Sequence, residues 1–184
     1  MVPSLLDANH HFVFPQAPFG VDRQLPKDVL CYPNPVTFSI NELTVGISTN
    51  DILMHLSREE VSRRGPNDIA VDRMARLAEH VLQQRHYYPL FPPAIGAQID
   101  YCSSAPLCLP ITPDLLILPS DLKCFAKQAL TSTVCINPGR LTRKRAGGTY
   151  AKVVVYPLPR SADADTQDRT HDVAERTRVE IYRI

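Results

Sequence analysis

The densest positive charge in the sequence is a basic stretch with four cations in six residues: Arg140, Arg143, Lys144 and Arg145. Such a cluster can contact nucleic-acid phosphates or an acidic protein surface, but a solvated loop has the same composition. No aromatic residue alternates with these cations to stack on bases, so the stretch alone gives little support to single-strand binding. We therefore favour a solvated loop and keep nucleic acid and an acidic partner as alternatives.

A second candidate contact is apolar. Tyr87, Tyr88, Leu90 and Phe91 lie among prolines and form a rigid strip of the kind that protein interfaces favour. The same strip would also serve to cover the protein's own core. The sequence leaves both interpretations open.

Histidines and cysteines show no spacing typical of a metal site. The five cysteines include no CxxC pair, and Cys108, Cys124 and Cys135 lie in apolar runs. We expect small buried side chains in a reducing compartment rather than zinc ligands or disulfides. His55 and His80 lie on expected helices, where core or surface roles are commoner than metal ligation.

Composition points to one globular domain. The chain has 184 residues, 44% of them hydrophobic, and a formal net charge of +1, which argues against a surface that is basic throughout. Its 17 prolines against 7 glycines predict short elements. The first residues lack the pattern of a signal peptide and no apolar run reaches membrane-spanning length, so we expect an intracellular, soluble protein that does not bind membranes.

The first half of the chain is expected to hold a hairpin and two helices. Residues 1–30 read as an irregular proline-rich segment, and alternation predicts a β-hairpin over 36–48. Cap residues at 48–51 predict a short helix to about Ser62. A helix over about 68–86 follows, with Asp72 and Arg76 paired on its polar side. Its apolar stripe consists of Met74, Leu77, Ala78, Val81 and Leu82.

The second half alternates strands with a helix, which places the fold in the α/β class. Strands are expected at 114–119, 133–136, 149–156 and 178–184, a helix at 121–130 and a polar loop at 158–176. The helix rests on the spacing of Leu122, Phe125, Ala126 and Ala129. The terminal strand suits either the sheet or an interface.

Several segments, in the same order along the chain, resemble the B subunit of the DNA polymerase alpha–primase complex. They are residues 3–11, 14–19, 38–41, 51–56, 84–93, 112–120 and 134–142. The resemblance implies a calcineurin-like phosphoesterase fold, with two packed β-sheets and flanking helices, preceded by an oligonucleotide-binding barrel. It implies a nuclear scaffold that is catalytically inactive and supports the initiation of DNA replication. The implied partners are the C-terminal domain of the polymerase alpha catalytic subunit, the primase subunits and, indirectly, DNA.

The resemblance also places this chain within the fold. Val2-Pro3-Ser4 resembles the end of a central strand, so the chain corresponds to a C-terminal portion that lacks the barrel and the first half of the phosphoesterase domain. We expect residues 1–157 to form that portion, 158–176 a polar loop and 177–184 the terminal strand of the same domain.

Enzymatic activity would require two metal ions held by Asp and His ligands. Active members of the phosphoesterase family carry Asp-x-His, Gly-Asp-x-x-Asp, Gly-Asn-His-[Asp/Glu] and Gly-His-x-His. Here Ala8-Asn9-His10-His11 resembles a remnant of the third motif that keeps Asn9 and His10. One remnant cannot hold two metals, so we expect no cofactor and no catalysis. The alternatives are a metal-dependent phosphoesterase fragment and the B subunit of another replicative polymerase.

Overall fold

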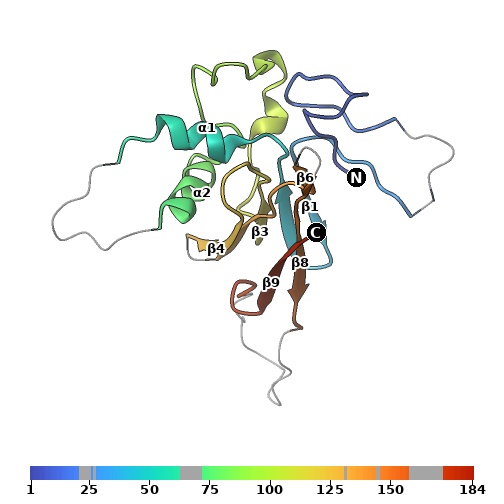
Figure 1. The fold of residues 1–184 in the computed structure, drawn as a ribbon, viewed down its shortest axis with the longest axis vertical. Coiled ribbons are helices and arrows are strands. Elements are labelled where there is room, and N and C mark those ends of the chain that lie inside the picture. Colours follow the sequence, from blue (N-terminus) through green and yellow to red (C-terminus); the bar gives the residue numbers. More distant parts are fainter. Residues whose placement is uncertain (21–25, 27, 63–71, 131, 144–145, 158–171) are drawn as a thin grey trace.

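A mixed five-stranded sheet forms the centre of the fold, in the order β1-β2-β3-β5-β4 (Figure 1). The computed structural model describes residues 1–20, 26, 28–62, 72–130, 132–143, 146–157 and 172–184. The strands are β1 (Val36–Ile40), β2 (Leu43–Ile47), β3 (Leu115–Ile117), β4 (Phe125–Ala129) and β5 (Thr133–Asn137). β2, β3 and β5 run parallel, and β1 and β4 are antiparallel at the two edges. The hairpin expected over 36–48 is confirmed, as are the buried strands near 115 and 134.

Two capped helices lie together on one face of this sheet (Figure 1). They are α1 (Ile52–Glu59) and α2 (Arg73–Gln83). Asp51 caps α1 by accepting a hydrogen bond from the Met54 amide, and Asp72 caps α2 through the Ala75 amide. The predicted apolar stripe of α2 is confirmed, because Leu77, Ala78 and Val81 are fully buried. The expected start of this helix near residue 68 lies outside the described residues.

Strand alternation separates the apolar side chains of the sheet into two clusters. Leu116 and Cys135 face the helices, whereas Leu115, Val134 and Ile136 face the other side. On that other side lies a second, two-stranded sheet made of β8 (Thr149–Val155) and β9 (Thr177–Arg183). The fold therefore has three layers, with helices, a mixed sheet and a hairpin. The α/β class is confirmed, and the terminal strand pairs with β8.

Short elements complete the chain. β6 (Thr142–Arg143) and β7 (Ala146–Gly147) form a small hairpin within the basic stretch, and single 3-10 turns occur at η1 (Tyr101–Ser103) and η2 (Ala105–Leu107). The expected loop at 158–176 falls largely outside the described residues, and residues 173–176 form turns before β9. The described part of the chain holds no helix long and apolar enough to cross a membrane.

The helix expected at 121–130 is wrong, because residues 125–129 form strand β4. Phe125 and Ala129 are buried in the helix-facing cluster, but Ala126 is exposed, so the side chains alternate with a period of two. The edge of β5 offers hydrogen bonds to a neighbouring strand, and β4 pairs with it over five residue positions. Sheet pairing thus overrides the helical spacing of the apolar residues.

Other local expectations are corrected as well. Asp72 does not pair with Arg76: the Asp72 carboxylate lies 2.5 Å from Lys127 of β4, and Arg76 binds Glu60. Residues 2–4 are not part of a strand. Among the cysteines, Cys135 is buried as expected, and burial raises the pKa of its thiol to about 12. Cys108 is exposed and Cys124 is half-buried.

Candidate partner-binding surface

A cleft of about 580 Å³ opens at the carboxyl ends of the three parallel strands. Its lining comes from residues 49–51 after β2, 119–120 after β3 and Arg140 after β5, together with residues 4–6 and 95–98 and the side chains of Phe12 and His55. This edge is where open α/β sheets hold their ligands, because loops from neighbouring strands converge there. The walls are mainly apolar, with charged groups at the rim.

The charged groups at the rim take part in hydrogen bonds and one ion pair. Asp51 accepts from the Met54 amide with one carboxylate oxygen and from the Asp121 amide with the other. The Asp121 carboxylate in turn binds the Arg140 guanidinium through two contacts of 2.6 Å. Arg140 therefore fixes the loop after β5 to the loop after β3, and a fork of this kind holds a defined geometry.

Asn137, fully buried at the end of β5, organises the same loops. Its side-chain oxygen accepts from the amides of Ser120 and Gly139, and its side-chain nitrogen donates to the carbonyls of Leu122 and Lys123. Gly139 has φ +76°, and a Cβ there would collide with the side chains of Thr149 and Cys124. The turn after β5 is thus closely packed and held by a single side chain.

His55 lies on α1 at the wall of the cleft. Its Nδ1 is 3.2 Å from the hydroxyl of Tyr88, which accepts a hydrogen bond from the Ala94 amide. Burial lowers the pKa of His55. The charge of Asp51 raises this pKa and that of Arg58 lowers it, and the net shift is downward, so the ring is neutral near neutral pH. A neutral imidazole at this position suits packing and hydrogen bonding better than a fixed positive charge.

The remnant motif lies outside the cleft lining. Asn9 is exposed. The His10 ring packs edge-on against Phe19, and its Nδ1 lies 3.3 Å from the side-chain nitrogen of Gln16. Within the described residues, no three His, Cys, Asp or Glu side chains gather as a metal-ligand group. The structure therefore does not bring Asn9 and His10 together with further candidate ligands.

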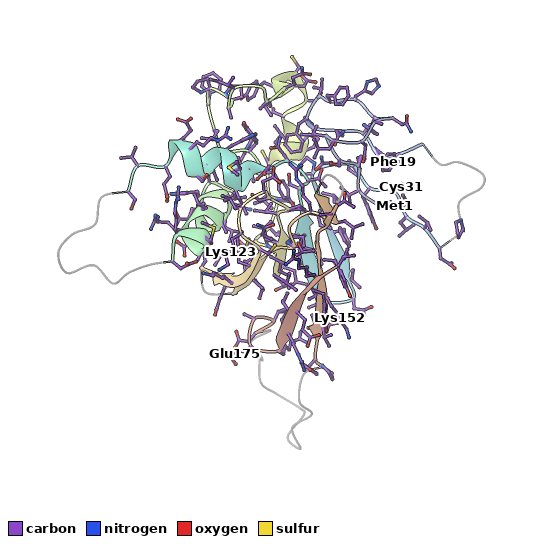
Figure 2. The ribbon with its side chains drawn as sticks, viewed as in Figure 1. Met1, Phe19, Cys31, Lys123, Lys152 and Glu175 are labelled. Carbon is purple, nitrogen blue, oxygen red and sulfur yellow. The ribbon has the colours of Figure 1, made fainter. Side chains whose placement is uncertain are left out.

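A buried polar network, which the sequence did not reveal, holds the N-terminal segment against the sheet. Gln16 and Asn34 exchange backbone hydrogen bonds, and the Asn34 side chain donates to Gln16 and Thr49 and accepts from the Thr49 amide. Thr49 reaches on to the carbonyl of Pro3. Figure 2 shows Met1 beside Cys31 in this region, where the Tyr32 amide donates to the Met1 carbonyl. No sequence periodicity marks these residues, because each bond joins distant loops.

The aromatic strip divides between core and surface. Tyr87 and Tyr88 are buried, and the Tyr87 hydroxyl donates to the Val36 carbonyl and contacts the Thr37 hydroxyl. Burial raises the pKa of Tyr87 to about 12. Phe91 is 84% exposed and packs edge-on against Tyr101. Of the strip, Tyr87 and Tyr88 thus cover the protein's own core, and Phe91 is exposed.

The described part of the basic stretch runs from Arg140, after β5, into strand β6, which pairs with β7. Arg140 belongs to the rim of the cleft, as described above. Arg143 lies at the end of β6, and Lys144 and Arg145 fall outside the described residues. The hairpin is joined to β8 and β9 through the Gly148 and Ile184 amides, which donate to the carbonyls of Leu141 and Gly148.

Comparison with known proteins gives these surfaces a context. Residues 1–127 match the family of DNA polymerase alpha/epsilon B subunits. This chain belongs to that family.

Within it, the chain is similar to proteins named as the B subunit of DNA polymerase alpha. It is 40% identical to the one from Schizosaccharomyces pombe over 100% of this chain and 33% of that protein. It is 37% identical to the one from Rattus norvegicus, over 97% of this chain and 30% of the relative. It is 33% identical to the one from Saccharomyces cerevisiae, over 84% of this chain and 26% of that protein. The resemblance seen in the sequence is confirmed, and the chain spans about a third or less of the length of these relatives.

Proposed function

We propose that this chain is part of a non-catalytic accessory subunit of DNA polymerase alpha–primase that acts in the nucleus during the initiation of replication. The observation that carries the proposal is the similarity, along the whole chain, to proteins named as the B subunit of DNA polymerase alpha. In this proposal the three layers form part of a calcineurin-like phosphoesterase fold that works by shape rather than chemistry. The rim supports a structural role, because the Asp121 carboxylate binds Arg140 and the Asp51 carboxylate accepts from the backbone amides of Met54 and Asp121.

The partner we propose is the C-terminal domain of the polymerase alpha catalytic subunit, with the primase subunits in the same complex and DNA reached through them. The contact surface we propose is the apolar patch formed by Phe91, Ile95 and Tyr101, all exposed. Phe12, which is also exposed, lines the same cleft as Ile95 and is included in the proposed surface. Exposed aromatic residues are the usual anchors of protein interfaces, since a partner pocket can bury them fully.

The proposal is tested by expressing this chain together with that C-terminal domain and analysing the mixture by gel filtration. We expect one co-eluting peak. Replacing Phe91 and Ile95 by Asp should weaken the complex at least tenfold, because each buries a charge in an apolar contact. Ile40→Asp, at the last residue of β1, where Ile40 is also exposed, is the matched control and should have no effect. A folded chain that elutes separately from the domain would overturn the proposed partner.

A further inference from the structure

The cleft at the carboxyl ends of β2, β3 and β5 keeps large apolar side chains exposed. Leu6, Phe12 and Ile95 line it from three separate segments of the chain, and all three are more than half exposed. These segments meet at one end of the central sheet (Figure 1). Large apolar side chains exposed together around a hollow are typical of an interaction site. The cleft volume of about 580 Å³ is also within the range of ligand sites, about 300–1,000 Å³.

A buried polar side chain in the lining of this cleft has no hydrogen-bond partner for its oxygen. Asn50 is only 2% exposed, and no atom of the described residues donates to its Oδ1. Two residues earlier, the buried hydroxyl of Ser48 likewise has no partner among the described residues. Buried acceptors of this kind are rare in native proteins, because the desolvation of the oxygen is then uncompensated. Asn50 therefore offers an acceptor that the described part of the protein does not use.

The Asn50 oxygen can turn toward an occupant of the cleft without losing an internal bond. Oδ1 lies beneath the cleft surface, and the outer torsion of an asparagine side chain has a broad minimum. Turning the amide breaks no hydrogen bond of this oxygen, since it has none among the described residues. The main chain stays in place, because the Asn50 carbonyl accepts from the Ile52 amide at the start of α1.

His55 supplies a donor to the same cleft. The Tyr88 hydroxyl accepts from the Ala94 amide, so its own proton is directed to His55 Nδ1, 3.2 Å away. This hydrogen bond assigns the proton of the neutral imidazole to Nε2. No described residue accepts a hydrogen bond from Nε2. The lining of the cleft therefore includes one unused donor, on His55, and one unused acceptor, on Asn50.

The charges in the lining of the cleft are already bound. The guanidinium of Arg140 is held by the Asp121 carboxylate through two contacts. The Asp51 carboxylate accepts from two backbone amides. The cleft thus suits an uncharged occupant better than a phosphate or a charged side chain. An amide is the uncharged group that donates and accepts at once, as Asn50 and His55 require.

We propose that this cleft binds an uncharged, apolar peptide segment of the partner protein, with one peptide amide of the segment held between Asn50 and His55. Apolar side chains of the segment pack against Leu6, Phe12 and Ile95. Peptide recognition commonly combines main-chain hydrogen bonds with pockets for side chains in this way. The inference rests on the proposed function for the identity of the partner, because Phe12 and Ile95 belong to the surface proposed for it.

The first test selects heptapeptides from a phage library on the full chain and measures fluorescein-labelled synthetic copies by fluorescence anisotropy. We expect uncharged, apolar peptides that bind Leu6→Asp about tenfold more weakly, because this variant places a charge in the apolar wall. Replacing the peptide amides by esters, one at a time, should weaken binding about five- to tenfold at one position. That loss should disappear in Asn50→Leu, which lacks the acceptor, so the double-mutant cycle isolates this hydrogen bond.

The stability of Asn50→Leu separates a binding role from a structural one. Its urea midpoint should equal or exceed that of the parent protein, because Oδ1 has no bond to lose in the described fold. A large loss of stability would assign Asn50 to the fold and would overturn the inference. As controls, Asn9→Leu makes the same change at an exposed residue outside the cleft lining, and Val61→Asp charges an exposed apolar residue after α1. Both should leave peptide affinity unchanged.

The second test titrates the same variants with the C-terminal domain of the polymerase alpha catalytic subunit. Asn50→Leu and Leu6→Asp should weaken that complex about tenfold, whereas the two controls should not. If the parent chain forms no complex, the proposed partner is refuted, and the peptide experiment still decides what the cleft binds.

Three results would overturn the inference. The first is a complex of equal affinity in Asn50→Leu and the parent chain. The second is a selection that yields charged peptides, or none whose binding depends on Asn50. The third is displacement of the selected peptides by oligothymidylate, which would assign the cleft to nucleic acid.

Discussion

The two faces of the central sheet are covered in different ways. Two helices and the loops beside them cover one face, where Leu77, Leu116 and Leu118 are completely buried. A single hairpin covers the other, and several of its contacts, including Ile117 and Val153, are only partly buried. The helix-covered face therefore contributes more buried apolar side chains, and more stability, than the hairpin-covered face. The second arrangement leaves the outer side of the hairpin exposed, where Tyr150, Tyr182 and Lys152 lie.

A buried charge on the helical side and one on the hairpin side should give the largest difference in stability between the two faces of the sheet. Leu77→Asp on α2 should reduce the free energy of unfolding by about 4 kcal/mol, because the carboxylate has no partner in the core. The matched change Val153→Asp on β8 should cost about half as much, since its side chain can reach solvent. Urea denaturation of both variants measures this. A melting curve for Leu77→Asp that matches the parent protein would contradict the assigned inward face of α2.

Adjacent residues of β3 allow a finer comparison. Leu116 faces the helices and is fully buried, whereas Ile117 faces the hairpin and is half-buried. Leu116→Ala should destabilise the protein by about 3 kcal/mol, and Ile117→Ala by about 1–2 kcal/mol, because the removed side chain has fewer packed neighbours. Chemical denaturation of the two variants measures both losses of unfolding free energy. Equal losses would show that the hairpin packs against the sheet as tightly as the helices do.

The smallest expected effect concerns the charged contact that joins the two helices. The pKa of Glu60 is lowered chiefly by the hydrogen bond from Arg76, 2.6 Å away, with His80 3.2 Å away also contributing. Arg73 is the other cation facing this carboxylate. Because the folded-state pKa is depressed, the contact stabilises the protein above the ordinary glutamate pKa of about 4.3 and is lost as pH falls through and below it.

Glu60→Gln should therefore cost about 1 kcal/mol at neutral pH and much less near about pH 3. Denaturant midpoints at the two pH values provide the measurement. Asp72→Asn, at the start of α2, is a useful control because it keeps a cap side chain while removing the contact with Lys127. A constant difference between Glu60→Gln and the parent protein at both pH values would contradict the role given to the Glu60 charge.

The sequence predicts best those parts of the fold whose signals are local. The hairpin at 36–48 follows from alternation, and the α2 stripe follows from helical spacing and is buried as expected. The prediction for β4 is wrong because Phe125 and Ala129 satisfy helical spacing as well as a period of two. The free edge of β5 decides between them, and that edge is a property of the tertiary structure.

The candidate surfaces show the same distinction. Phe91 and the basic stretch are visible in the sequence because the residues are neighbours. The lining of the cleft, by contrast, comes from segments far apart in the sequence, such as residues 4–6, 49–51 and 95–98. The Gln16–Asn34–Thr49 network similarly joins three loops, and polar residues of this kind in a sequence suggest exposure rather than burial.

The side chain of Asn137 has a consequence for the exchange of amide hydrogens with solvent. The amides of Ser120 and Gly139 are bonded to one side-chain oxygen rather than to a neighbouring strand. Both hydrogens are released by the same rotation or displacement of Asn137, so they should exchange with solvent at linked rates although they lie in different loops. The two amides thus report together on the opening of the carboxyl edge of the sheet.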